Sequence, residues 1–172
     1  MAEFSAWFAG TVDRLNEAIG AAAAWMTTFM VAIQFGIVVM RFAFGENLIL
    51  VQDMVLYLHG MVFMLGAGYL ALRNGHVRVD LIYRDLTERR RHWIDLAGTL
   101  FLMLPFATAV LILSLPYALD SWRILEGSRE ITGLPLVFLL KTTIPLFAVL
   151  LILQGLANAI RLALRLRQRE RI

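Results

Sequence analysis

Histidine, arginine and aspartate residues gather in one short stretch of the sequence, residues 70–86, LALRNGHVRVDLIYRDL. Side chains of these types act as general acids, bases and anion ligands, so a catalytic or nucleic-acid-binding loop is a first hypothesis. The stretch directly follows an uncharged apolar run, and apolar residues are threaded between its charges. Nearby aspartates and glutamates offset its arginines, which disfavours nucleic-acid binding. An active-site loop and a segment lying against a membrane remain as alternatives.

Lys141 is the one charged residue inside an otherwise uncharged apolar segment, residues 134–160. A charge at membrane depth is costly and marks a pairing or functional site. Two interpretations are open: the lysine stem extends to the headgroups, or the ammonium pairs with an acid. The candidate acids are Asp53, Asp120, Glu126 and Glu130.

His59 is also embedded in an apolar segment and suggests a haem ligand or a proton relay. Haem within a helical bundle usually needs two axial ligands, and the other two histidines, His76 and His92, lie in the charged region. We therefore expect His59, like Gln34 and Gln154, to hydrogen-bond to a neighbouring helix. The sequence contains no cysteine, phosphate loop, metal-ligand spacing or nucleophile motif. It predicts neither an enzyme nor a cofactor.

The composition assigns these residues to a membrane protein. Hydrophobic residues make up 60% of the 172 residues and charged residues 17%, against about 45–50% and 25% in soluble domains. A soluble bundle would need polar faces that the long apolar segments lack. A bilayer core of about 30 Å needs roughly 20 apolar helical residues. Four segments qualify as spans: residues 18–40, 54–72, 96–119 and 134–160.

The predicted fold is all-α: one integral membrane domain, residues 1–172, with four transmembrane helices and interfacial amphipathic helices. Residues 1–17 carry an apolar stripe typical of an interfacial helix; the alternative is an early start of the first span. Residues 73–95 are expected to form an amphipathic loop, and residues 161–172 a basic tail. The N-terminus has neither the basic region nor the short apolar core of a signal peptide.

The distribution of arginine and lysine predicts the orientation of the chain. With four spans, the two tails and the loop 73–95 share one side, which collects twelve such residues, whereas the opposite side collects three. The positive-inside rule places both termini, the loop and the tail in the cytoplasm. The outward connection, residues 120–135, contains Trp122, Arg123 and Arg129. It is predicted either as a docking surface for a soluble protein or as a plain solvated connection.

Two blocks of sequence resemble a known family. These are GYLALRNGHVRVDLIYRDL (68–86) and SWRILEGSREITGLPLVFLLKTTIPLFAVLLILQGLANAIR (121–161). They resemble the small membrane subunit, DctQ-like, of tripartite ATP-independent periplasmic (TRAP) transporters. The matched motif positions in the loop are Arg73, His76, Val77, Val79 and Asp80. The family assigns them no transport role, and topology and anchoring are their expected contribution.

The resemblance implies a subunit of the bacterial inner membrane without a cofactor. Its partners would be membrane lipids, a large many-span elevator-type subunit and a periplasmic substrate-binding protein. The complex would take up an organic acid, commonly a carboxylate, by sodium symport, with the small subunit as scaffold and anchor. Two other functions stay open: a self-sufficient oligomeric channel or transporter assembled around Lys141, and the membrane anchor of a redox enzyme.

Overall fold

Five α-helices and one π-helical turn make up the part of the chain that the structure describes. The structure is a computed structural model and describes residues 2–73, 86–130 and 132–169. Its elements are α1 (Ala2–Phe44), α2 (Ile49–Leu72), α4 (Glu88–Gly98), η1 (Thr99–Met103), α5 (Leu104–Arg123) and α6 (Val137–Arg169). Within these residues there is no strand. Four helical segments are long and apolar enough to cross a membrane: Trp7–Phe44, Ile49–Leu72, Glu88–Arg123 and Val137–Arg167. The predicted all-α class with four such helices is confirmed.

The first helix, α1, runs without a break from Ala2 to Phe44. The sequence predicted an interfacial helix at 1–17 and a span at 18–40, and the structure joins them. The junction reads GAAAAWM (20–26), and alanine is the strongest helix former, so nothing there interrupts the backbone hydrogen bonds. The 43 residues of α1 extend about 65 Å at the α-helical rise. This is about twice the thickness of a bilayer core, so part of α1 lies beyond the hydrocarbon.

The helix α1 ends at a glycine because the turn needs a left-handed residue. Gly45 has φ of 74°, a region that glycine enters without the steric cost of a Cβ. Its N–H donates to Arg41 O at 3.2 Å, which satisfies one of the free carbonyls at the end of the helix. The short connection that follows leads directly into α2, which packs along α1 as a hairpin.

The third span is longer than the predicted 96–119, because α4, η1 and α5 follow one another without a break. At its start Thr87 has extended backbone angles, although its side chain makes no capping hydrogen bond. In η1 the N–H of Leu104 donates to Thr99 O, five residues back. The next residue, Pro105, has no N–H to donate, and such interruptions of the hydrogen-bond ladder bend or widen a helix.

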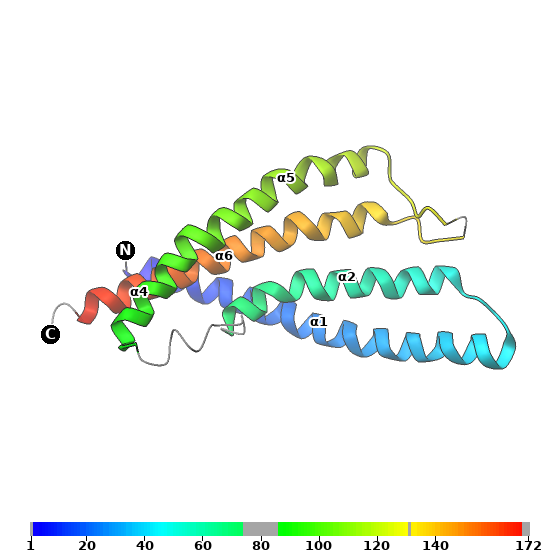
Figure 1. Cartoon of the computed structure of the whole chain (residues 1–172), viewed down its shortest axis with the longest axis horizontal. Helices are drawn as coiled ribbons and strands as arrows, with labels where there is room; N and C mark the ends of the chain where they lie inside the picture. The colour runs from blue at the N-terminus through cyan, green and yellow to red at the C-terminus, as the bar shows by residue number, and fades with distance from the viewer. Residues whose placement is uncertain (1, 74–85, 131, 170–172) are drawn as a thin grey trace.

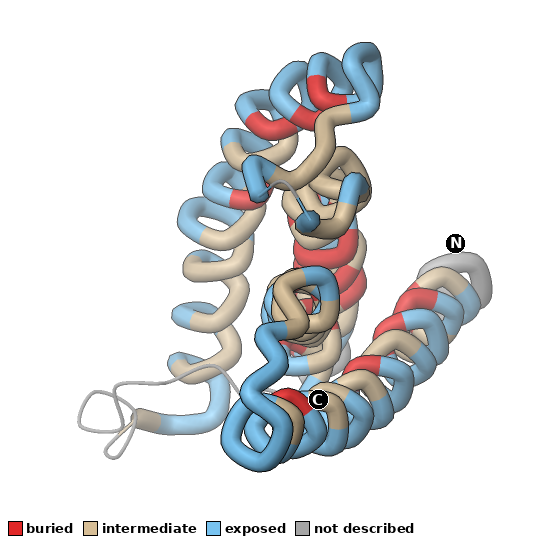
Figure 2. The backbone as a smooth tube through the Cα atoms, turned by 90° about the vertical axis from the view of Figure 1, so that its right-hand side faces the viewer, coloured by how far each residue is buried: buried red, intermediate tan, exposed pale blue. Residues whose placement is uncertain are grey.

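Figure 1 shows the long helices side by side in the order α5, α6, α2 and α1, with both termini at the same end of the molecule. The connections 45–48 and 124–136 lie at the opposite end. Helix α6 is the central element, since it contacts α1, α2, α4 and α5. Figure 2 shows buried residues along α6, where Ala148, Leu150, Leu151 and Ala157 are found.

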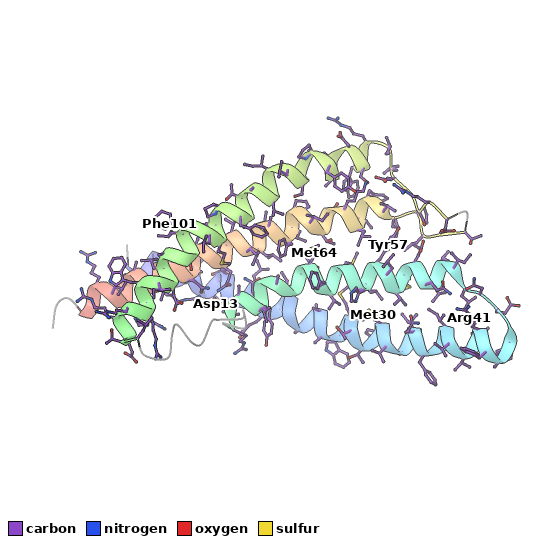
Figure 3. All side chains as sticks on the ribbon, viewed as in Figure 1. Asp13, Met30, Arg41, Tyr57, Met64 and Phe101 are labelled. Carbon is purple, nitrogen blue, oxygen red and sulfur yellow. The ribbon has the colours of Figure 1, made fainter. Side chains whose placement is uncertain are left out.

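Small residues let the other helices approach α6 closely. Ala157 packs against Ala9 and Val12 of α1, and Leu151 packs against Ala71 of α2 and Ala107 of α5. Close approach of this kind favours helix association in a membrane. Large apolar side chains face outward instead, as Figure 3 shows for the labelled Phe101, which is 77% exposed. A water-soluble protein rarely exposes so much apolar surface, and lipid or another membrane protein must cover it.

Candidate functional site

A buried polar network joins α1 to α6 near the end that carries both termini. The amide Nδ2 of Asn16 donates to Gln154 Oε1 at 2.7 Å, and both residues have no exposed surface. Gln154 Nε2 is in turn 3.2 Å from Asp13 Oδ1 and 3.3 Å from Asn158 Oδ1. Two side chains of α1 and a neighbour on α6 are therefore linked through the single amide of Gln154.

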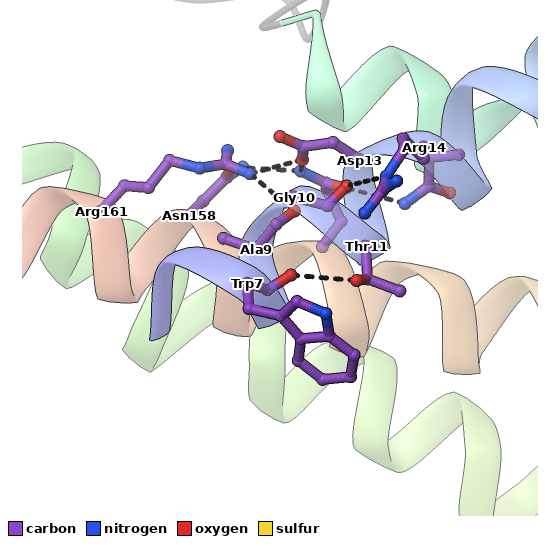
Figure 4. Close-up of polar contacts among 10 residues, drawn as sticks. Trp7, Ala9, Gly10, Thr11, Asp13, Arg14, Asn158 and Arg161 are labelled. Atoms are coloured by element: carbon purple, nitrogen blue, oxygen red, sulfur yellow. Dashed lines mark hydrogen bonds and ion pairs between the residues drawn. The ribbon is translucent and has the colours of Figure 1, made fainter. Parts of the chain in front are cut away.

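Arg161 closes this network at the side facing the termini. Its guanidinium forms an ion pair with Asp13, donates to Asn158 Oδ1 at 2.9 Å and donates to the backbone oxygen of Ala9 at 3.3 Å. Figure 4 shows these contacts converging between the two helices. Both charged side chains are 30% exposed, so each charge is partly removed from water and compensated by the other. Such a set of directional contacts fixes the position of α1 on α6.

Gly68 brings α2 into the same junction. The side-chain oxygen Oδ1 of Asn16 lies where a Cβ on Gly68 would be, and the Cβ of Leu150 would be 3.2 Å from that Cβ. Oδ1 of Asn16 has no hydrogen-bond partner within the described residues. The absence of a side chain at position 68 lets α1, α2 and α6 meet around one amide.

At the opposite end of the molecule, Lys141 pairs with Glu126. The Nζ–Oε2 distance is 2.5 Å, and Nζ lies 4.0 Å from the centroid of the Tyr117 ring. The hydrogen bond from Lys141 lowers the pKa of the Glu126 carboxyl below its ordinary value. Helix α6 begins at Val137 rather than at the predicted residue 134, so Lys141 lies only one turn inside the helix.

The other acids considered for Lys141 have different partners or positions. Asp120 pairs with Arg123 at 2.9 Å, and Asp53 Oδ2 accepts the N–H of Leu134 at 3.0 Å. Glu130 is exposed in the connection between α5 and α6. Of the four candidate acids, the structure therefore pairs Lys141 with Glu126.

The connection 124–136 is held against the helices on both sides. The phenol of Tyr57 in α2 donates to Leu134 O at 3.0 Å. The Trp122 indole N–H donates to Thr142 Oγ1 at 2.8 Å, and the Trp122 ring packs edge-on against Phe138 with centroids 4.6 Å apart. Trp122 therefore joins α5 to α6. Part of its side chain is covered by these contacts, and only the remainder is exposed to a partner. Arg123 and Arg129, the other predicted docking residues, are exposed at this end.

Of the five motif positions in the predicted loop, the structure describes one. Arg73 ends α2, and its guanidinium lies 2.9 Å from Glu17 Oε1 of α1 and 5.5 Å from the Tyr69 ring centroid. More than half of the Arg73 side chain is exposed, so this pair contributes little to stability. His76, Val77, Val79 and Asp80 lie outside the described residues.

Sequence reasoning missed most of the buried network. Gln154 was expected to bind a neighbouring helix, and it does. A signal for its neighbours exists, because Gln154, Asn158 and Arg161 are spaced by four and three residues and so share one helical face. Their partners on α1 follow only from the crossing of the two helices. For Gln34 and His59 the described residues supply no such partner, because neither side chain hydrogen-bonds to another group in this part of the chain.

The family of the chain follows from comparison with known sequences. The model of the family described as "Tripartite ATP-independent periplasmic transporters, DctQ component" matches residues 28–165. The chain belongs to the DctQ family. It is therefore a small membrane component of a TRAP transporter. The family is one of transporter components and not of enzymes. No curated protein sequence matches the chain, and no solved structure does.

The family model covers only part of the buried network between α1 and α6. Gln154, Asn158 and Arg161 fall inside the matched residues, whereas Asp13 and Asn16 precede them. The DctQ-like part of the bundle is thus joined by hydrogen bonds to an N-terminal segment that the family model does not cover. In the described residues, no group of three or more His, Asp or Glu side chains is placed to hold a metal ion.

Proposed function

We propose that this chain is a scaffold and anchor for the large elevator-type subunit of a TRAP transporter. In that role it would support sodium-coupled uptake of an organic acid, a carboxylate, that a periplasmic binding protein delivers. The observation that carries the proposal is the DctQ match across residues 28–165. In this role the subunit would hold the fixed part of the large subunit rigid and present an apolar surface to the lipid. Substrate and sodium would bind elsewhere in the complex.

The internal contacts of the bundle support a static role. An elevator-type subunit moves one part against another, and the fixed part must resist that movement. Helix α6 is held to α1 by the network around Gln154 and to the α5–α6 connection by the Lys141–Glu126 pair. These two fixed points lie near opposite ends of the bundle, so tilting α6 against its neighbours would break one of them.

The proposed location is the bacterial inner membrane with both termini in the cytoplasm. Both termini lie at one end of the molecule (Figure 1). The two tails and the loop 73–95, which a four-span chain places on that side, contain twelve arginines and lysines, whereas the two connections on the other side contain three. The first turns of α1 would then lie at the headgroups as an interfacial segment, together with the basic residues that follow position 160. Such residues gain about 1 kcal/mol each near anionic lipid.

The exposed arginines at the opposite end, Arg123 and Arg129, would then face the periplasm and contact the binding protein. Reversing both charges, Arg123→Glu with Arg129→Glu, should lower the rate of uptake at limiting binding protein. Arg14→Glu is the matched control, because Arg14 is exposed at the other end of the bundle. Equal uptake by the two variants would remove this docking surface from the proposal.

Complex formation tests the scaffold role. The tagged chain is co-expressed with the large TRAP membrane subunit of the same organism, extracted in mild detergent and analysed by gel filtration with light scattering. We expect one species that contains both proteins. Separate elution of two stable, folded proteins would contradict the proposal.

The alternative of a self-sufficient channel around Lys141 receives no support from the geometry. Lys141 is compensated by Glu126 at the end of the bundle and offers no free charge to a pore. If the alternative were correct, the reconstituted chain alone would conduct or exchange solute, and Lys141→Met would abolish this. A redox anchor would show a bound chromophore in its absorption spectrum.

A further inference from the structure

A groove runs between α1 and α2, and the residues that line it all come from these two helices. Its volume is about 430 Å³. It is lined by four apolar side chains, Met30, Val31, Val55 and Leu56, and by three polar ones, Gln34, Gln52 and His59. Met30, labelled in Figure 3, lies where the two helices of the hairpin meet.

The polar side chains of the groove lie at two different depths. Gln52 is close to the turn between α1 and α2, where its Nε2 donates to Asn47 Oδ1 at 2.8 Å. Gln34 lies ten residues before the end of α1, and His59 ten residues after the start of α2. Counted from the charged residues that bound the two predicted spans, Arg41 and Asp53, Gln34 lies seven residues and His59 six residues inside, or about 9–10 Å at the helical rise. Gln34 and His59 therefore lie side by side in the groove, within the depth of the hydrocarbon core.

Neither of these two side chains is satisfied inside the subunit. Both are exposed on the surface of the hairpin, and no hydrogen bond joins either of them to any described residue. Hydrocarbon offers no donor or acceptor, so an amide and an imidazole at this depth are unfavourable unless a partner supplies one. Lipid tails cannot do so, and the charged ends of the two spans are about 9–10 Å away.

The outer face of α5 provides the contrast. Its large exposed side chains are all apolar through the middle of the helix: Phe106, Ile112, Leu113 and Leu115. Its polar residues at that depth are satisfied locally, since Thr108 donates to Leu104 O at 2.8 Å and Ser114 is buried. The face of α5 suits lipid, whereas the α1–α2 face needs a protein.

The shape of the α1–α2 face also suits a helix. A groove between two packed helices accepts the side-chain ridge of a third helix. Polar groups placed in such an interface hydrogen-bond across it and hold the helices in register.

We propose that the α1–α2 groove binds a transmembrane helix of the large subunit, and that this helix presents a hydrogen-bonding side chain to Gln34 and His59. The inference rests on the proposed function, because the family description makes the chain one component of a larger transporter. A second copy of this chain or lipid alone are the competing occupants, and the experiment separates them.

The test uses photo-crosslinking in membranes that contain both subunits. A photo-crosslinking amino acid is placed at Leu56 in the groove or, as the matched control, at Leu113 on α5; both side chains are exposed, 59% and 74%. We expect a crosslink to the large subunit from position 56 and none from position 113. A crosslink from position 56 to another copy of this chain, or no protein crosslink from that position, as expected for lipid alone, would overturn the inference. A crosslink to the large subunit only from position 113 would overturn it as well.

A second measurement tests the two polar residues directly. The double variant Gln34→Leu with His59→Leu stays apolar and helical, so the subunit alone should fold as before, judged by circular dichroism and gel filtration. We expect it to retain the large subunit about threefold to tenfold less well in co-purification, the range for loss of one or two interhelical hydrogen bonds. Undiminished co-purification would overturn the inference while leaving the proposed function intact. Failure of the unaltered chain to co-purify would overturn both.

Discussion

The buried amide pair of Asn16 and Gln154 allows a sharp test of how α1 is held to α6. Replacing Gln154 by Met keeps an unbranched side chain of similar length but removes three hydrogen bonds. Asn16 then loses the partner of its Nδ2 in a site without exposed surface. A buried donor left without a partner costs about 1–3 kcal/mol. Asp13 and Asn158 keep their contacts with Arg161, so we expect the loss to stay within this range.

The reverse change, Asn16→Leu, keeps the branched shape of the side chain and leaves Gln154 Oε1 without the donor of the 2.7 Å hydrogen bond. We expect a similar loss. When both residues are replaced, no polar atom of this pair remains unsatisfied, and apolar pairs of the same shape are close to neutral. The double variant should therefore be more stable than the sum of the single losses implies, with a coupling energy of about 1–3 kcal/mol.

The assay is reversible unfolding in mixed micelles, followed by tryptophan fluorescence and circular dichroism. Gln34→Met is the matched control: it removes an exposed amide that has no described partner, so the stability of the isolated subunit should not change. If the two losses simply add in the double variant, the two amides are not coupled, and the reasoning about the junction of α1 and α6 is refuted.

Two further predictions concern close packing and a charged pair. Gly20→Ala should destabilise the α1–α2 hairpin by about 1–3 kcal/mol through overpacking, because its Cβ would be 2.5 Å from Tyr69 Cγ. Gly36→Ala, in open space in the same helix, should instead leave the melting temperature unchanged or raise it, because alanine favours helix over glycine by about 0.5–1 kcal/mol. Glu126→Gln should lower stability near neutral pH. Because Lys141 lowers the pKa of Glu126, the stabilisation is present above the ordinary carboxyl pKa and is lost as the pH falls through the lowered value. The melting temperatures of the variant and the unaltered chain should therefore converge on acidification, and a constant difference would refute the pairing.

The helical class and the number of spans could be predicted because hydropathy reports directly on the hydrocarbon core. The ends of the helices could not. Hydropathy stops α6 at residue 160, yet the helix continues to Arg169, since leucine and arginine favour helix whether or not they lie in lipid. The same argument explains α1, whose charged first turns looked like a separate element but are joined to the span by alanines.

The polar contacts were harder to predict because they depend on tertiary geometry. The candidates for Lys141 included Glu126, but only the path of the 124–136 connection brings that carboxylate to 2.5 Å from Nζ. Asp13 lies in the segment that the sequence predicted as an interfacial helix, residues 1–17. Its place in the buried network requires the first turns of α1 to cross α6, and no local pattern encodes that crossing.

Uptake into proteoliposomes tests most directly whether this chain works as one subunit of a larger transporter. Vesicles containing this chain alone, the large subunit alone, or both are compared, each with the binding protein outside and a sodium gradient. A panel of radiolabelled carboxylates serves as the probe. We expect uptake only when both membrane subunits are present together. Uptake by the chain alone, or equal uptake by the large subunit without it, would contradict the account.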